Sequence, residues 1–374
     1  MKILHIITSL ENGGAQAIMY NLVLRSEQHE HVVISLMSDD KYGELLRESS
    51  IEVLSLDFKK GAMSLGGVYA LYKRIRKVSP DVIQTWMYHS DLIGSIAGRL
   101  AGVKAIVWGI HNSTFDKNRT NKKTRLVVRV LSLLSGILPS KIISCSAVAL
   151  EIHKSRGYKA SKLVFVANGY DLEKFSPSPD QNNLFKIPGV TDQKLCYFGT
   201  VARWSDQKNQ LNLVEACGIL LARRFTDFQC VLVGPDLDTS NIHLVELIRS
   251  KNLHNHIQLA GVHTDVARVM NSLNFHVLPS AFGEAFPNVV AEAMACGVPC
   301  LVTDVGDSSQ MVGDYGWVVN PRDPGALADK IMEIAAMIPG DEWQAIKHGC
   351  RERALQRFDI SRMVNEYNAV WMAS

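Results

Sequence analysis

Residues 279–303, PSAFGEAFPNVVAEAMACGVPCLVT, carry the most informative pattern in this chain. Glu284 and Glu292 bracket a short apolar segment between two strand-like runs. Pro287 is tolerated only in the first turn of a helix, so the pattern predicts a helix that begins near Asn288. Glu284 would lie on the preceding loop and Glu292 early in the helix. A helix N-terminus favours phosphate, so both carboxylates would flank a ligand held there. Two solvated acids on an ordinary βαβ unit are the alternative.

The length and composition bound the class of protein. A chain of 374 residues suits two domains of about 150 to 200 residues each. Its 47% hydrophobic and 21% charged residues are typical of a soluble globular protein with a large core. No apolar run approaches the ~18 residues that a membrane span needs, and the N-terminal MKILHIITSL fits a strand better than a signal peptide. The seven cysteines lie mostly in apolar runs, so we expect buried, reduced thiols in a cytoplasmic protein.

The charge is distributed unevenly along the chain. The net charge is +3, but residues 1–170 contain 23 Lys and Arg against 13 Asp and Glu, whereas the remainder contains 17 against 24. A basic half beside an acidic half indicates that the basic half meets an anionic partner or surface. We predict no nucleic-acid binding, because no aromatic and basic binding motif accompanies the charge.

Short β-branched runs alternate with longer helical patterns along almost the whole chain, which is typical of βαβ units and parallel sheets. Strands are predicted at 3–8, 32–37, 53–56, 82–86, 105–110, 141–144, 164–167, 195–200, 229–233, 257–260, 275–278, 298–303 and 317–319. Helices are predicted at 15–25, 65–78, 90–101, 147–156, 207–223, 241–250, 288–295 and 324–337, and beyond. The polar, Pro-containing stretch 176–183 predicts a linker, with a hinge near 176–194. The pattern therefore predicts two successive α/β domains, with ligands bound outside the carboxyl ends of the strands.

Two glycines follow the first predicted strand, at the turn into a helix. Gly13 and Gly14 would let backbone N–H groups approach an anion closely, although a plain tight turn explains them equally well. Their spacing differs from the G-x-G-x-x-G fingerprint of a dinucleotide site, which disfavours an oxidoreductase.

Two cations follow the first strand of the second half. Arg203 and Lys208 lie just beyond the strand predicted at 195–200 and near the start of the next helix. Fixed cations beside a helix N-terminus suit a diphosphate, because Arg forms bidentate contacts and Lys acts as a point charge. Two solvated surface cations are the alternative.

Taken together, these residues resemble a known family. Arg203, Lys208, Glu284, Glu292 and the run PNVVAEAMA at 287–295 look like retaining glycosyltransferases of family 4, which have the GT-B fold and include enzymes of bacterial polysaccharide synthesis. Further similar elements are Gly13-Gly14, His111-Asn112, Asn168-Gly169-Tyr170-Asp171 with Phe175, and Gly316 before a strand. The resemblance covers nearly the whole chain, in the family's order.

The resemblance implies two Rossmann-like domains whose parallel sheets face an interdomain cleft. The acceptor-binding domain would span 1–177 and the donor-binding domain 178–358. A last helix within 359–374 would pack back on the first domain. Arg203 and Lys208 would hold the donor diphosphate, Glu284 would lie by the donor sugar and phosphates, and Glu292 would accept hydrogen bonds from the nucleotide ribose.

The resemblance also implies roles for residues of the first domain. Gly14 would present its N–H to the distal phosphate, and His111 would face the reacting sugar. The implied catalytic residues are His111, Arg203, Lys208 and Glu284. The implied donor-binding residues are Gly13, Gly14, Arg203, Lys208, Glu284, Ala285, Phe286, Pro287, Asn288, Val289 and Glu292. Three positions depart from the family: Gln16 where an acid is common, Ala285 in place of the usual Gly, and Asn112 in place of a frequent Asp.

Glycosyl transfer requires stabilisation of a departing diphosphate, which fixed cations and helix dipoles supply electrostatically. We therefore expect no metal and no cofactor. Asp236 and Asp238 form a DxD string like a metal motif, but they follow a strand on an expected loop, and we predict no metal there. Retention needs a carboxylate nucleophile or same-face attack within an ion pair. Because the motif supplies no well-placed nucleophile, our hypothesis is same-face attack, with the leaving phosphate helping to deprotonate the acceptor.

An aromatic turn follows the strand predicted at 82–86. Trp86, Tyr88 and His89 would bind the acceptor sugar by stacking, together with Asn112, and ordinary packing of the aromatic residues is the equal alternative.

Residues 117–141 form a basic amphipathic stretch of the kind that lies on an anionic membrane surface. A helix that packs its apolar face on the sheet is the alternative. The first interpretation predicts a protein that is peripheral on the cytoplasmic face of the inner membrane.

The sequence thus predicts an enzyme that moves a sugar from a nucleotide-sugar donor, with UDP as the favoured nucleotide, to a hydroxyl of a saccharide acceptor. A lipid-linked acceptor, such as one on polyprenyl diphosphate, suits the basic first domain and indicates bacterial surface polysaccharide synthesis. Two alternatives stay open: a nucleotide-sugar epimerase on the same kind of fold, and a catalytically silent nucleotide-sugar-binding protein.

Overall fold

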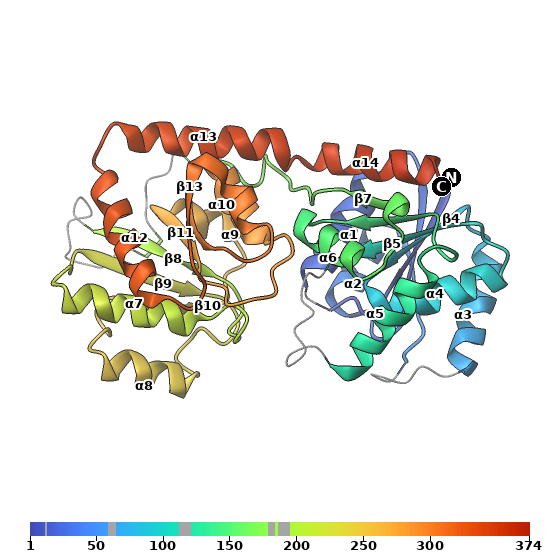
Figure 1. Cartoon of the computed structure of the whole chain (residues 1–374), viewed down its shortest axis with the longest axis horizontal. Helices are drawn as coiled ribbons and strands as arrows, with labels where there is room; N and C mark the ends of the chain where they lie inside the picture. The colour runs from blue at the N-terminus through green and yellow to red at the C-terminus, as the bar shows by residue number, and fades with distance from the viewer. Residues whose placement is uncertain (12, 59–64, 112–120, 179–183, 186–194) are drawn as a thin grey trace. The chain divides into compact units, whose positions relative to one another are not determined.

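The computed structural model describes residues 1–11, 13–58, 65–111, 121–178, 184–185 and 195–374. These residues form two compact units, and each unit contains one parallel sheet with helices against it (Figure 1). The first unit comprises Met1–Gly169 and Ile360–Ser374, and the second comprises Tyr170–Asp359. The predicted class, α/β with two Rossmann-like sheets, is confirmed.

The first unit contains a seven-stranded sheet in the order β3-β2-β1-β4-β5-β6-β7. Its strands are β1 (Lys2–Ile7), β2 (Glu30–Ser35), β3 (Glu52–Ser55), β4 (Val82–Trp86), β5 (Ala105–Ile110), β6 (Lys141–Ser144) and β7 (Leu163–Phe165). β1, β2, β4 and β5 are buried almost throughout, as expected for parallel strands that are covered on both faces. The strand order reverses between β1 and β4.

Helices join these strands and cover the sheet. They are α1 (Gly14–Arg25), α2 (Asp40–Glu48), α3 (Leu65–Val78), α4 (Tyr88–Leu100), α5 (Lys122–Leu134), α6 (Ala147–Ser155), the 3-10 turn η1 (Ala160–Lys162) and α14 (Ile360–Met372). α3, α4 and α5 pack in sequence beside one another, while α1 contacts both α2 and α14. The structure describes the basic stretch from residue 121 onward, and residues 117–120 lie outside the described part.

The C-terminal helix α14 belongs to the first unit. Ser26 Oγ donates to Asn368 Oδ1 at 2.9 Å, and Trp371 Nε1 donates to Gln84 Oε1 at 3.0 Å. The chain therefore leaves the first unit after Gly169 and returns to it at Ile360.

The second unit repeats this topology with six strands, in the order β10-β9-β8-β11-β12-β13. The strands are β8 (Cys196–Val201), β9 (Phe228–Val233), β10 (Ile257–Gly261), β11 (Phe275–Leu278), β12 (Cys300–Thr303) and β13 (Gly316–Val319). The helices are α7 (Gln210–Ala222), α8 (Ile242–Ser250), α9 (Val266–Asn271), α10 (Asn288–Ala295), α11 (Ser308–Val312), the 3-10 turn η2 (Gly313–Tyr315), α12 (Pro324–Met337) and α13 (Glu342–Arg357). Here the strand order reverses between β8 and β11.

Several predicted elements have the same bounds in the structure. β4, β5, β6, β11, α3, α10 and α12 have the predicted bounds. α2, α9 and α11 are not among the predicted helices, because each is too short for a helical period to be recognised. All seven cysteines are free and buried, as expected. No helix in the described part of the chain is long and apolar enough to cross a membrane.

Candidate active site

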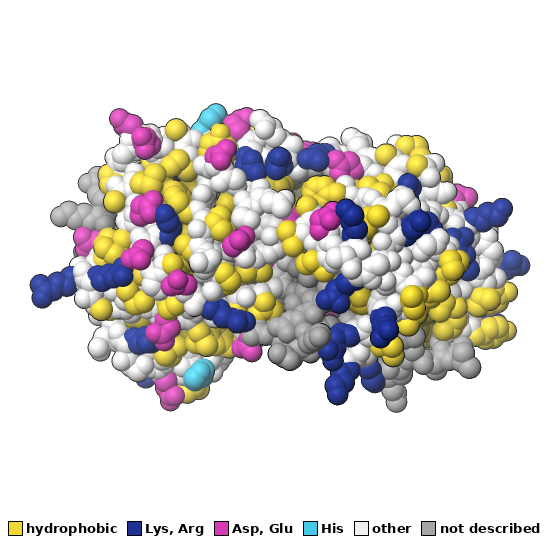
Figure 2. All heavy atoms as spheres, in the orientation of Figure 1, with side chains coloured by type: hydrophobic (Ala, Val, Ile, Leu, Met, Phe, Trp, Pro, Cys, Tyr) yellow, Lys and Arg dark blue, Asp and Glu magenta, His cyan; other side chains and the backbone are white. Residues whose placement is uncertain are grey.

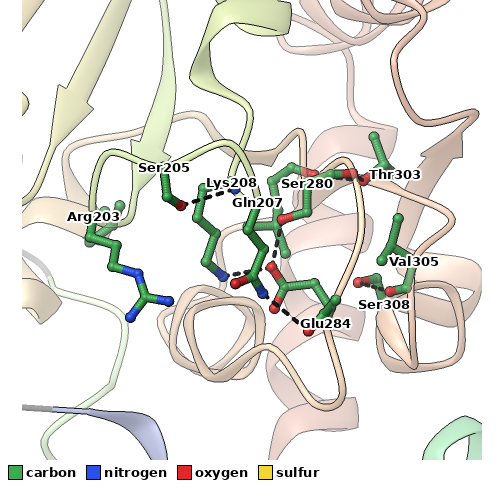
Figure 3. A network of polar contacts seen from close by, with 12 residues as sticks. Arg203, Ser205, Gln207, Lys208, Ser280, Glu284, Thr303, Val305 and Ser308 are labelled. Carbon is green, nitrogen blue, oxygen red and sulfur yellow. Dashed lines mark hydrogen bonds and ion pairs between the residues drawn. The ribbon is translucent and has the colours of Figure 1, made fainter. Parts of the chain in front are cut away.

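The loops after β8 and β11 meet at the carboxyl edge of the second sheet, where the strand order reverses. Lys208 lies on the first loop and Glu284 on the second. Lys208 Nζ donates to Glu284 Oε1 at 2.7 Å, and these side chains are 18% and 6% exposed (Figure 3). Ligands of open α/β sheets bind outside such a reversal point. The Lys208–Glu284 pair therefore marks the candidate donor site.

Further polar contacts hold Glu284 in place. Ser280 Oγ donates to the same Oε1 at 2.6 Å, and Thr303 Oγ1 donates to the Ser280 carbonyl at 2.6 Å. Gln207 Nε2 donates to the Gly283 carbonyl at 3.1 Å (Figure 3). These contacts tie the ends of β8, β11 and β12 into one polar network. A buried ion pair adds little net stability, because desolvation offsets the attraction between the charges. The network therefore fixes the position of the Glu284 carboxylate without adding much to stability.

A buried histidine lies close to this pair. His276, on β11, is fully buried, and its Nε2 accepts the Val201 N–H at 3.2 Å. Burial, and then the charge of Lys208, lower the pKa of His276 to about 3. The imidazole is therefore neutral at physiological pH, and Lys208 supplies the positive charge.

Arg203 lies on the same loop as Lys208, and its side chain is exposed (Figure 3). Gln210 supports this loop, since its buried side chain donates to the Arg203 carbonyl at 2.8 Å and accepts the Ser205 N–H at 3.5 Å. α7 begins at Gln210, later than the predicted residue 207, because Asn209 adopts a left-handed backbone with φ of 51°. Sequence reasoning missed Gln210, since only its burial distinguishes it from a solvated glutamine.

The helix α10 begins at Asn288, as predicted, with Pro287 as its N-cap. Four of the predicted donor residues are buried beside it: Ala285, Phe286, Pro287 and Val289. Asn288 Oδ1 accepts a hydrogen bond from the Tyr170 hydroxyl at 2.6 Å. Phe286 stacks on the Tyr170 ring at 6.4 Å between centroids. Residues 285–289 thus contribute packing and a helix N-terminus, where N–H groups lack acceptors within the helix, rather than side-chain charge.

A close backbone approach fixes the loop that carries Glu284. Gly306 has φ of 61°, and a Cβ on it would lie 2.1 Å from the Glu284 carbonyl oxygen. The neighbouring Asp307 N–H donates to the Ala285 carbonyl at 3.0 Å. Glycine is therefore required at position 306, a constraint that a sequence cannot reveal, because the clashing atom is distant along the chain.

Glu292 lies in the body of α10 and is partly buried. Desolvation raises its pKa from 4.5 to about 7, although Lys174 acts in the opposite direction. A carboxyl group whose pKa is strongly raised by burial is a candidate functional group.

Replacing Glu292 by glutamine is expected to stabilise the protein at alkaline pH. Between pH 4.5 and about 7 the Glu292 carboxyl group is ionised in the unfolded chain but still protonated in the folded chain. The unfolding free energy of the wild type therefore falls as the pH rises through this window. The unfolding free energy of Glu292→Gln should exceed that of the wild type by on the order of 2 kcal/mol at pH 8, and the two should be nearly equal at pH 4. Urea unfolding at both pH values measures it. An equal effect at the two values would contradict the raised pKa.

The glycine turn after β1 belongs to the first unit. Gly13 has an extended backbone and is the N-cap of α1, which begins at Gly14. Gln16, the departure from the family pattern, is nearly buried, and its Nε2 donates to the Ser9 carbonyl at 3.1 Å. Its amide oxygen would lie 2.4 Å from a Cβ on Gly13. Glycine at 13 therefore leaves room for Gln16 to fold back over the turn.

The structure favours the packing alternative for Trp86 over its predicted acceptor role. Trp86 is fully buried. Its ring stacks on His111 at 5.0 Å between centroids and on Tyr367 at 5.9 Å. Its indole N–H donates to His5 Nδ1 at 3.2 Å. With its ring covered and its donor engaged, Trp86 has no surface for a sugar. It instead positions His111, the pKa of which is lowered by burial to about 4.

Tyr88 is also a core residue, which again favours the packing alternative. It is 6% exposed, and its hydroxyl lies 3.0 Å from His153 Nε2. His89, next to it at the start of α4, is partly exposed, and burial lowers its pKa. Its acceptor role stays a prediction. Asn112 lies outside the described residues.

The DxD string follows β9. Asp238 accepts hydrogen bonds from the Ser240 N–H and hydroxyl, at 2.8 and 2.5 Å, so it forms a turn. Within the ranges that the structure describes, no group of three His, Cys, Asp or Glu residues is placed to hold a metal ion.

Two family models match successive parts of the chain. Residues 12–174 match Glycosyltransferase Family 4, and residues 192–337 match Glycosyl transferases group 1. An Escherichia coli relative, UDP-Gal:alpha-D-GlcNAc-diphosphoundecaprenol alpha-1,3-galactosyltransferase, is 25% identical over 81% of this chain and 78% of its own. A Campylobacter jejuni relative, N,N'-diacetylbacillosaminyl-diphospho-undecaprenol alpha-1,3-N-acetylgalactosaminyltransferase, is 24% identical over 79% of each chain.

Solved structures share the fold over the full length. The Anabaena protein HepE in complex with UDP superposes with a TM-score of 0.85 at 21% identity, and its complex with UDP-glucose with 0.83 at 22%, each covering 100% of both chains. A glycosyltransferase from Rickettsia africae gives a TM-score of 0.80 at 18% identity, covering 99% of this chain and 97% of its own.

Proposed function

Since this chain belongs to the family-4 glycosyltransferases of the GT-B fold, we propose that it transfers a sugar from a UDP-sugar to a hydroxyl of a lipid-linked saccharide. The observation that carries the proposal is the buried Lys208–Glu284 pair at the reversal point of the second sheet. Such a pair offers one fixed cation for phosphate and one carboxylate for sugar hydroxyls.

In this proposal the second unit holds the donor. Lys208 and Arg203 bind the diphosphate, with the N-terminus of α10 as a third source of positive potential. Glu284 faces the donor sugar, and Glu292 accepts hydrogen bonds from the ribose hydroxyls. UDP is the nucleotide that we favour, because the E. coli relative uses UDP-Gal and the Anabaena neighbour was solved with UDP and with UDP-glucose.

The proposed acceptor is a saccharide on a polyprenyl diphosphate. Both relatives are named for acceptors on diphosphoundecaprenol, and residues 1–170 of this chain carry 23 Lys and Arg against 13 Asp and Glu. His111, His89 and Gly14 belong to this basic unit. The reaction would then take place at the cytoplasmic face of the inner membrane, in surface polysaccharide synthesis.

The proposed reaction retains configuration and uses no metal. The bond between the anomeric carbon and the diphosphate oxygen breaks, and a bond to the acceptor oxygen forms on the same face. The acceptor proton passes to the leaving phosphate. Arg203 and Lys208 stabilise the negative charge that develops on the leaving diphosphate.

A panel of UDP-, GDP-, ADP- and CMP-sugars, with a polyprenyl-diphosphate saccharide as acceptor, tests this function. Nucleotide release from one UDP-sugar is expected, unaffected by EDTA, with a product whose anomeric configuration by NMR equals that of the donor. Release without acceptor, together with an altered donor sugar, would indicate the epimerase. UDP binding with no turnover would indicate the silent binding protein, and an inverted product would refute same-face attack.

A further inference from the structure

The helix α5 divides its apolar residues between two faces. Val127, Val128 and Leu131 are buried in the core of the first unit. Leu126 and Leu133 are 64% and 76% exposed. Packing of α5 on the sheet therefore explains the first set of residues and leaves the second set unexplained.

Cations flank the exposed leucines on the outer face of α5. Lys122, Leu126, Arg129 and Leu133 follow one another at spacings of four, three and four residues, so they lie on one side of the helix. Ile137, just beyond the helix, is 72% exposed. We call these five residues the α5 outer face.

The charge around this face has one sign. The sequence contains no Asp or Glu between residues 117 and 150. Within the described part of the chain, neither Lys122 nor Arg129 is paired with a carboxylate. Figure 2 shows Lys and Arg side chains beside hydrophobic ones over the region where Figure 1 labels α5.

A further exposed leucine lies on the neighbouring helix. Leu100, at the end of α4, is 67% exposed, and α4 packs against α5. The adjacent Arg99 donates to the Leu138 carbonyl at 3.0 Å, which joins the end of α4 to the segment after α5. The exposed leucines therefore lie on packed helices rather than on a loose loop.

We propose that the α5 outer face rests on the surface of an anionic lipid bilayer. The exposed leucines and Ile137 would enter the interface, while Lys122 and Arg129 would meet anionic headgroups. Nucleic acid would leave the apolar side chains in water, and a second copy of this face would bring like charges together. The inference extends the proposed function, because a lipid-linked acceptor lies in such a bilayer.

Vesicle flotation tests the inference and needs neither donor nor acceptor, so its failure would leave the transfer assay untouched. The purified protein is expected to float with vesicles of phosphatidylglycerol and phosphatidylethanolamine, and not with phosphatidylcholine alone. Because the headgroup contacts are electrostatic, binding should weaken as salt rises toward about 0.5 M.

Matched variants separate this face from net charge. Leu126→Ser with Leu133→Ser should lower the partition coefficient at least about tenfold. Lys122→Glu with Arg129→Glu should lower it about a hundredfold. Arg74→Glu with Lys77→Glu, on the exposed side of α3 in the same unit, changes the net charge equally and should have a much smaller effect.

A fluorescent probe reports the contact directly. All seven native cysteines are buried, so Leu133→Cys can be labelled selectively with an environment-sensitive dye. Its emission should shift to the blue on anionic vesicles, whereas a dye at Ile242→Cys, an exposed helix position of the second unit, should not respond. Absence of flotation at low salt, an equal loss on reversing α3, or a Leu-dependent dimer in light scattering would overturn the inference.

Discussion

Replacing Lys208 by alanine is expected to lower kcat/KM for the sugar donor by about a thousandfold. The substitution removes the cation proposed to stabilise the leaving diphosphate. It also leaves Glu284, which is 6% exposed, without its counter-charge, and an unpaired buried charge costs about 3 kcal/mol of stability. Initial rates of nucleotide release and urea unfolding measure the two effects.

The double variant Lys208→Ala with Glu284→Gln separates these effects. Removing both charges should restore much of the stability, because no buried carboxylate is left unpaired. It should not restore turnover, because the diphosphate still lacks its cation. Lys251→Ala, which breaks the more exposed pair with Glu215 at 2.7 Å in the same unit, is the control and should leave kcat/KM unchanged. Near-normal turnover by Lys208→Ala would contradict the role of this residue.

Replacing Gly306 by alanine is expected to destabilise the second unit by about 3 kcal/mol and to weaken UDP binding at least about tenfold. The new Cβ would lie 2.1 Å from the Glu284 carbonyl, so the loop that carries Glu284 must move. Thermal unfolding and calorimetric titration of UDP measure the two effects.

Gly102→Ala is the matched control for this prediction. Gly102 also has a positive φ, of 89°, but no heavy atom lies within 4 Å of its added Cβ. Its substitution therefore carries backbone strain alone, which costs about 1 kcal/mol. If Gly306→Ala costs no more than Gly102→Ala, the close approach to Glu284 does not constrain the loop.

The fold followed from the sequence because each βαβ element is a local pattern. Pro287 marks the start of α10, and Pro80 and Asp81 precede the apolar run of β4. The order of the strands is not local. Lys208 and Glu284 are 76 residues apart, and their contact depends on β11 lying beside β8.

The packing of the candidate acceptor residues is likewise not a local property of the sequence. Trp86 and Tyr88 follow a strand, but Tyr367 of the C-terminal helix stacks on Trp86, and the Tyr88 hydroxyl lies within hydrogen-bond distance of His153. The importance of Gly306 lies in Glu284, a neighbour that only the fold brings close, whereas Gln210 contacts residues nearby in the sequence and is distinguished only by its burial. Burial is a property of the whole unit, so a motif alone does not predict it.

The central claim is that Lys208 and Glu284 form a nucleotide diphosphate site in the second unit. Calorimetric titration of UDP into the intact wild-type protein and into Lys208→Ala and Lys251→Ala tests it most directly. One UDP per chain should bind to the wild type and to Lys251→Ala with equal affinity, and at least about tenfold more weakly to Lys208→Ala. Equal binding of UDP to wild type and Lys208→Ala would contradict the claim.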